Sequence, residues 1–152
     1  MKILVCTDGS EQSKKAMEQA LVIAQGCNVH EVAVIHVYDE GLDFTKTPFQ
    51  EGKAPTKDDL EQFNKIQEDH KNERKNDLQK AVKYFEDNNL HVRGIFKEGH
   101  PSHIIVETAS EEGFDMIVIG SRGIGGFKKV FLGSVSSAVV QEAKDCSVTI
   151  VK

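Results

Sequence analysis

Short apolar runs alternate with amphipathic stretches along the whole chain. The apolar runs are rich in Val and Ile and have the length of buried strands; they cover residues 2–7, 31–39, 91–96, 114–119 and 147–152. Helical spacing or helix start signals occur between them, over residues 10–26, 56–88, 101–113 and 134–144. Strands that alternate with helices are typical of a parallel sheet. We therefore predict one doubly wound α/β domain over residues 1–152, with helices on both faces of the sheet.

Local signals refine several of these elements. Ser10 is a suitable N-cap, and Thr56 with Asp59 three residues later resembles a helix start. Gly94 interrupts the run 91–96, which favours an edge or near-edge strand. Residues 39–55 are polar, contain Gly and Pro, and predict a long exposed loop. The predicted helix that follows is mostly charged in its first half, which indicates a solvated face, and its apolar stripe comes late: Leu78, Ala81, Val82 and Phe85.

Glycine is concentrated in one stretch, Gly120 to Ser137, between a predicted strand and a predicted helix. The stretch matches neither the P-loop nor the dinucleotide fingerprint G-x-G-x-x-G. Its own pattern is Gly120-x-x-Gly123, nine residues, then Gly133-Ser134. Spacing of this kind alone is a weak signal, because glycine-rich loops between strands and helices are common in purely structural roles.

The position of these glycines nevertheless favours a nucleotide site. Gly120 ends a strand, where open α/β sheets bind ligands, and it lets the backbone approach a sugar or phosphate. Gly133 and Ser134 begin a helix, whose free N–H groups and dipole attract an anion. Ser134 and Ser136 add hydroxyl groups, and Arg122, Lys128 and Lys129 add positive charge.

The carboxyl ends of the first two predicted strands add further groups. Asp8 is placed to accept hydrogen bonds from a ribose or to hold a divalent metal beside phosphates. Val37 can offer backbone N–H and C=O groups to a purine. Alternatively, Asp8, Gly9 and Ser10 have a purely structural role, as a turn followed by a helix cap.

Composition excludes some classes of function. The formal net charge of −5 argues against a protein that coats nucleic acid. The apolar runs are too short to span a membrane and the first residues lack a signal-peptide pattern, so we expect a cytoplasmic protein. Cys6, Cys27 and Cys146 fit reduced thiols. His100 and His103 lack an evident third ligand, which favours surface histidines over a metal site.

With these residues assembled, the chain resembles the universal stress protein family over essentially its full length. The similarity includes "ILVCTDGSEQSKKAMEQAL", "EGHPSHIIVETASEEGFDMIVIGSRGIGG" and "FLGSVSSAVVQEAKDCSVTIV". ATP-binding members carry G-2x-G-9x-G-[ST], which Gly120, Gly123, Gly133 and Ser134 satisfy. The family implies a five-stranded parallel sheet of order 3-2-1-4-5. The site residues carried over, with Thr7 where the family more often has Val, are Thr7, Asp8, Val37, Ile119, Gly120, Arg122, Gly123, Gly133, Ser134, Val135 and Ser136.

The resemblance implies an ATP-binding regulatory protein of the stress response. Asp8 would lie beside the ribose, the phosphates and a bound Mg or Mn, and Val37 beside the adenine. It also implies a homodimer through strand 147–151, although this chain lacks the Pro that many members have before that strand. Two alternatives stay open: a slow ATPase, for which Asp8 is the one carboxylate we can place, and a partner-docking module that uses residues 40–75 and a ligand other than ATP.

Overall fold

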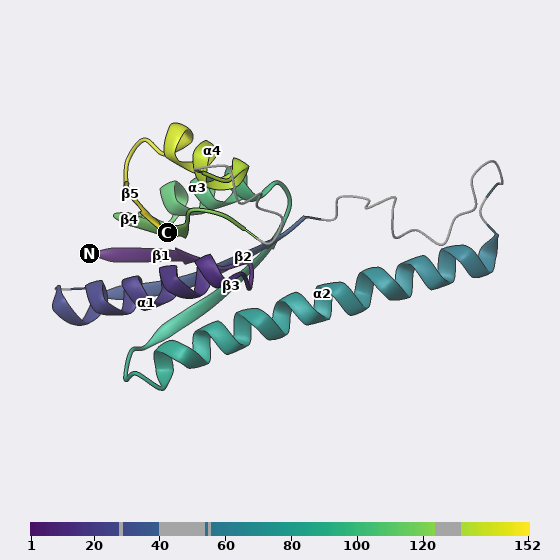
Figure 1. Cartoon of the computed structure of the whole chain (residues 1–152), viewed down its shortest axis with the longest axis horizontal. Coiled ribbons are helices and arrows are strands. Elements are labelled where there is room, and N and C mark those ends of the chain that lie inside the picture. Colours follow the sequence, from purple (N-terminus) through teal and green to yellow (C-terminus); the bar gives the residue numbers. More distant parts are fainter. Residues whose placement is uncertain (28, 40–53, 55, 124–131) are drawn as a thin grey trace.

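A five-stranded parallel sheet forms the centre of the molecule (Figure 1). The computed structural model describes residues 1–27, 29–39, 54, 56–123 and 132–152. The strands are β1 (Lys2–Cys6), β2 (Glu31–Tyr38), β3 (Val92–Glu98), β4 (Met116–Gly120) and β5 (Ser147–Val151). Their spatial order is β3-β2-β1-β4-β5, with every neighbouring pair parallel. The order and the edge position of β3 confirm the predictions from the sequence.

Two helices cover each face of the sheet. Helices α1 (Glu11–Gly26) and α2 (Lys57–Glu86) lie on one face, and α3 (Pro101–Glu111) and α4 (Ser134–Glu142) lie on the other (Figure 1). The predicted start signals are confirmed: Ser10 caps α1 by accepting a hydrogen bond from the backbone of Ser13, and Thr56 forms a capping box with Asp59 at the start of α2. Element ends differ from the predicted ones by about one to two residues, as fraying ends usually do.

The core consists of two apolar layers separated by the sheet. One contains Ile3, Val5 and Val34 with the small side chains of α1 and with Leu78, Ala81 and Phe85 of α2. The other contains alternate residues of the same strands, packed against α3 and α4. Because both faces of the central strands are covered, these strands read as continuous apolar runs.

Helix α2 extends well past the sheet (Figure 1). Its buried residues begin only at Leu78, and residues 57–77 are exposed or half-buried. This confirms the prediction of a solvated first half. Because parallel strands place the helix between them antiparallel to the strands, the projecting half of α2 stands on the side of the carboxyl ends of the strands.

An ionic network fastens the opposite, amino-terminal edge of the sheet. Lys2 pairs with Glu31 at 3.2 Å, and Arg93 pairs with Glu31 at 2.9 Å and with Glu112. The Lys2 ammonium also donates to the backbone oxygen of Glu112 at 2.6 Å. The Arg93 guanidinium and the Lys2 ammonium lie over the Phe114 ring, which is buried. Together these contacts join β1, β2, β3 and the end of α3.

Candidate functional site

The chain leaves β1 through a tightly bonded turn. The Ser10 N–H donates to Oδ1 of Asp8 at 2.9 Å, and the Gly9 N–H donates to the Thr7 hydroxyl at 3.3 Å. The Thr7 hydroxyl donates to Oγ of Ser13 at 3.4 Å, and Ser13 in turn donates to the Ser10 carbonyl at 2.8 Å. Gly9 has φ of +83°, a conformation that disfavours other residues. These bonds fix the direction of the Asp8 carboxylate.

Two glycines at the end of β4 allow close backbone approaches. A Cβ on Gly120 would lie 2.8 Å from the carbonyl carbon of Gln12, so α1 packs directly onto the end of β4 only because no side chain is present. A Cβ on Gly123 would lie 2.5 Å from Oδ2 of Asp8. The order of the sheet reverses between β1 and β4, and ligands of open α/β sheets bind at such a switch point.

The first turn of α4 directs unused backbone donors toward the same place. Gly133 is the N-cap and provides no side-chain cap, and the first bond within the helix runs from the Ser137 N–H to the Gly133 carbonyl at 2.9 Å. The N–H groups of Ser134, Val135 and Ser136 therefore have no partner inside the helix. The Ser136 hydroxyl is directed to the carbonyls of Ser121 (3.0 Å) and Gly133 (3.1 Å), so only its N–H is oriented for a ligand.

Val37 presents its backbone at the end of β2. The Thr7 N–H donates to the Ile35 carbonyl at 3.0 Å, which shows that Ile35 directs its backbone groups toward β1. Alternate residues of a strand direct their backbone groups to the same neighbour, so Val37 directs its N–H and C=O to that side as well. Since β1 ends at Cys6, these groups of Val37 point past the end of β1.

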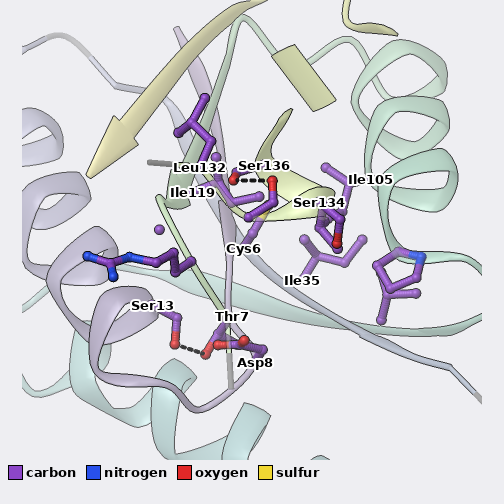
Figure 2. Close-up of a pocket in the computed structure, with 17 residues that line it drawn as sticks. Cys6, Thr7, Asp8, Ser13, Ile35, Ile105, Ile119, Leu132, Ser134 and Ser136 are labelled. Atoms are coloured by element: carbon purple, nitrogen blue, oxygen red, sulfur yellow. Dashed lines mark hydrogen bonds between the residues drawn. The ribbon is translucent and has the colours of Figure 1, made fainter. Parts of the chain in front are cut away.

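These features surround one cavity of about 550 Å³ (Figure 2). In Figure 2, Thr7, Asp8 and Ser13 lie on one side of the cavity, and Ile105, Ser134 and Ser136 lie on other sides. The structure brings together all of the site residues predicted within its described part: Thr7, Asp8, Val37, Ile119, Gly120, Arg122, Gly123, Gly133, Ser134, Val135 and Ser136. Lys128 and Lys129 lie outside the described residues.

Several lining residues were missed by the sequence analysis: Cys6, Ser13, Ile35, Pro101, Ile105 and Leu132. Ile35 shares a face with Val37, because side chains of a strand alternate, and this was a usable signal. Pro101 and Ile105 form an i, i+4 pair on α3, which becomes part of the site only through packing across the sheet. No signal in the sequence pointed to Ser13 or Leu132.

Two titratable side chains near the cavity, Cys6 in its lining and His36 on the opposite face of the sheet, favour their neutral forms. Burial, aided by the charge of Asp8, raises the pKa of the Cys6 thiol far above its usual range. Burial lowers the pKa of His36, and the positive charge of Arg74 lowers it further, while Asp8 and Asp77 act in the opposite direction. His36 is 3% exposed and stacks on Phe96 with ring centroids 5.9 Å apart. The charge of Asp8 thus acts on both side chains, and Arg74 has the larger electrostatic effect on His36.

The remaining candidate residues do not form a metal centre by themselves. Nδ1 of His100 lies 3.1 Å from the Ser102 hydroxyl. No group of three or more His, Cys, Asp and Glu side chains in the described part of the chain is arranged to hold a metal ion. Cys6, Cys27 and Cys146 are free thiols. None of the described helices is long and apolar enough to cross a membrane.

Chemically, the cavity combines an apolar floor with two kinds of polar group. Ile35, Ile119 and Ile105 offer a surface for a flat ring, the α4 amides offer anion binding, and Asp8 offers a hydrogen-bond acceptor. A ligand with a ring, hydroxyl groups and a phosphate would satisfy all three.

Comparison with known proteins shows which family the chain is similar to. The universal stress protein family model matches residues 1–152. Universal stress protein YxiE of Bacillus subtilis is 34% identical over 152 residues, which are 99% of this chain and 98% of that protein. Universal stress protein MJ0577 of Methanocaldococcus jannaschii is 32% identical over 145 residues, 93% of this chain and 89% of that protein. Its solved structure has a TM-score of 0.71 at 30% identity and covers 99% of this chain and 96% of that chain.

The fold also occurs with a bound nucleotide. The universal stress protein from Archaeoglobus fulgidus, solved in complex with dAMP, has a TM-score of 0.64 at 22% identity and covers 100% of this chain and 98% of that chain. The full-length family match and the identity to the Bacillus and Methanocaldococcus proteins lead to one conclusion. This chain is a member of the universal stress protein family.

Proposed function

We propose that this chain binds an adenine nucleotide, ATP, in the cavity between β1, β4 and α4, and acts as a nucleotide-dependent regulatory protein in the stress response. The strongest support is the first turn of α4. Three successive backbone N–H groups without helical partners line a cavity whose opposite side holds a carboxylate. A nucleotide fits these groups, because its phosphates can accept hydrogen bonds from the N–H groups and its ribose hydroxyl groups can donate to the carboxylate.

The residues present fit such a ligand part by part. The amides of Ser134, Val135 and Ser136 receive the phosphates, and Gly133 leaves the space that a side chain would take. Asp8 accepts hydrogen bonds from the ribose, and the outward backbone groups of Val37 meet the adenine edge. Ile119, Gly120, Arg122 and Gly123 line the nucleoside. Thr7 acts on Asp8 through the turn that it helps to hold.

A divalent cation, Mg or Mn, accompanies the nucleotide in this proposal. The chain supplies Asp8 as its carboxylate ligand, and the phosphates supply most of the other oxygens. The described residues offer no preformed metal cluster, so the cation enters with the nucleotide rather than before it.

Asp8 is also the one carboxylate among the described lining residues, which supports a binding protein more than an efficient hydrolase.

The family and the outer strand support the remaining parts of the proposal. The Archaeoglobus relative is solved with dAMP, an adenine nucleotide. Strand β5 is an edge strand of apolar, β-branched character, which supports a homodimer through this strand. The free thiols agree with a cytoplasmic protein.

Nucleotide extraction and calorimetry test the site. We expect purified protein to release ATP on denaturation, and the stripped protein to bind ATP with Mg at a micromolar Kd, about −8 kcal/mol. In Gly133→Ala the Cβ would meet its nearest atoms at 3.4 Å or more, an ordinary contact, so this variant folds and serves as a matched control. Gly133→Val adds methyl groups where phosphate oxygens lie and should lose binding without unfolding.

The two variants separate the possible failures. Equal affinity of Gly133→Val and wild type would show that the phosphates bind elsewhere. A folded wild type that gives no heat with ATP, ADP or AMP in the presence of Mg would overturn the proposed function itself.

A further inference from the structure

Helix α2 touches the turn that carries Asp8, although it lies on the other face of the sheet from α3 and α4. The contact is at Gly9, where a Cβ would lie 3.3 Å from Oδ2 of Asp77 and 4.0 Å from Nη1 of Arg74. Arg74 and Asp77 pair with each other, with Nη1 3.4 Å from Oδ2, and the exposed Lys80 ammonium binds the other oxygen of Asp77 at 3.1 Å. Neither lines the cavity, so any effect on a ligand passes through the turn.

This ion pair is less exposed than the pairs near the two ends of α2, whereas the Lys71–Glu98 pair, with side chains 31% and 44% exposed, is comparably shielded. The side chains of Arg74 and Asp77 are 30% and 22% exposed. In contrast, those of Lys83 and Asp87 are 70% and 59% exposed, and those of Lys57 and Glu61 are 88% and 68% exposed. Exposed pairs contribute little, whereas a pair shielded from water interacts more strongly with its neighbours.

His36 interacts electrostatically with Arg74, Asp77 and Asp8. It is buried on β2, on the face covered by α2, and Asp8, Arg74 and Asp77 all act on its electrostatic environment. Phe96 stacks on its ring, and the Lys75 ammonium lies 5.7 Å from the Phe96 centroid. Arg74 and Asp77 thus lie beside Gly9 and act electrostatically on the buried His36, on which the charge of Asp8 acts as well.

We propose that Arg74 and Asp77 are positioning residues for the Asp8–Gly9–Ser10 turn, and that they hold the Asp8 carboxylate toward the sugar of the bound nucleotide. This rests on the proposed function. The hydrogen bonds within the turn fix its internal shape, but Gly9 has no side chain to pack against α2, so the position of the turn as a whole on this side depends on the groups that α2 presents. The Arg74–Asp77 pair occupies the space into which the turn would otherwise move. Helix α2 thereby becomes part of sugar recognition without touching the ligand.

The inference predicts how changes at Arg74 and Asp77 affect the affinity for ATP. Arg74→Gln removes the guanidinium beside Gly9 and leaves Asp77 with the exposed Lys80 as its partner, and Asp77→Asn removes the partner that holds Arg74. Either change should weaken ATP binding by about tenfold, the effect of one misplaced charged hydrogen bond. In EDTA, where no Mg can link Asp8 to the phosphates, binding of 2′,3′-dideoxy-ATP should change less than about twofold, because its sugar offers Asp8 no hydroxyl group.

The experiment is calorimetry in EDTA with ATP and 2′,3′-dideoxy-ATP on wild type, Arg74→Gln, Asp77→Asn and Asp8→Asn. The matched controls are Lys83→Gln and Asp87→Asn, which break an exposed pair on the same helix and should bind both ligands like wild type. Arg74→Gln in an Asp8→Asn background should cause no further loss of ATP affinity, because the two changes act on the same hydrogen bonds.

The outcomes distinguish this inference from the proposed function. If wild type binds ATP, Asp8→Asn weakens it and the α2 variants do not, the positioning role is overturned and the nucleotide site stands. An equal loss for both ligands indicates a general structural role and overturns it as well.

Hydrogen exchange of the unliganded protein gives a readout that needs no nucleotide. The amides of Gly9 and Ser10 should exchange faster in both α2 variants than in wild type and the controls. Unchanged exchange at these amides overturns the inference, whether or not the wild type binds ATP.

Discussion

Gly123 and Asp8 meet across the switch point so closely that a Cβ on Gly123 would lie 2.5 Å from Oδ2 of Asp8. Oδ1 of the same carboxylate is held by the Ser10 N–H, so the short Asp8 side chain cannot move aside without losing that bond. We expect Gly123→Ala to weaken ATP binding by about tenfold while the free energy of unfolding changes by less than about 1 kcal/mol, because Gly123 is exposed. Calorimetry and urea denaturation measure the two effects.

Gly26→Ala is the matched control, because nothing lies within 4 Å of a Cβ at this position, the last residue of α1. It should leave ATP affinity unchanged and raise stability by up to about 1 kcal/mol. Wild-type affinity in Gly123→Ala would mean that Asp8 does not contact the ligand from its present position.

Acid should destabilise the protein through His36. Its pKa is lowered by burial from the ordinary value of 6.5, so the unfolded chain binds a proton at a higher pH than the folded one. The contribution of neutral His36 to stability is therefore fully present above about pH 6.5 and is lost as the pH falls through the folded-state pKa. Its slope cannot exceed about 1.4 kcal/mol per pH unit, the value for one proton.

Urea denaturation between pH 7.5 and 5 tests this assignment. His36→Leu should show a smaller loss of stability than wild type over that range. His103→Gln, an exposed histidine of α3, should follow the wild-type curve. Parallel curves for His36→Leu and wild type would assign the acid sensitivity to other groups.

The proposed dimer makes a prediction about the outer edge of β5. Ser147 donates its N–H to the Asp115 carbonyl, and Val151 accepts from the Ser121 N–H, so residues 147, 149 and 151 direct their backbone groups to β4. Val148 and Ile150 direct theirs outward. Val148→Pro removes one outward donor and should shift the protein toward monomer, with modest loss of stability. Light scattering gives the mass.

Thr149→Pro is the counterpart, since it removes a donor that bonds to β4 and should destabilise the fold itself. A charged residue at Val148 or Ile150 is a poorer test, because both side chains pack against the α3–α4 layer of the core. A wild type that is monomeric at micromolar concentration would refute the β5 dimer.

The fold was predictable from the sequence because its signals are local. The central strands are covered on both faces and so appear as plain apolar runs, and the caps at Ser10 and Thr56 are chemical preferences of the residues themselves. The order of the strands came from the family resemblance and was confirmed. Periodicity alone does not determine which strand neighbours which.

The candidate site was predictable only where backbone geometry requires a particular residue. Gly120 and Gly123 occupy positions that a side chain would obstruct, and that need is visible as glycine in the sequence. Pro101 and Ile105 reach the cavity by the packing of α3, and Arg74 reaches Gly9 across a large separation in the chain. Such contacts depend on the relative placement of whole elements, which no local pattern encodes.

The ionic network of Lys2, Glu31, Arg93 and Glu112 has a practical consequence for engineering. These ion pairs and the hydrogen bond from Lys2 join the strands at the end farthest from the cavity. Replacing side chains around the cavity therefore leaves these interactions in place. The chain is therefore a suitable scaffold for installing recognition of a different small molecule. Pro101 is the natural first position for a library, since it is half-buried and belongs neither to the turn nor to the glycine backbone, whereas Ile105 is buried in the core.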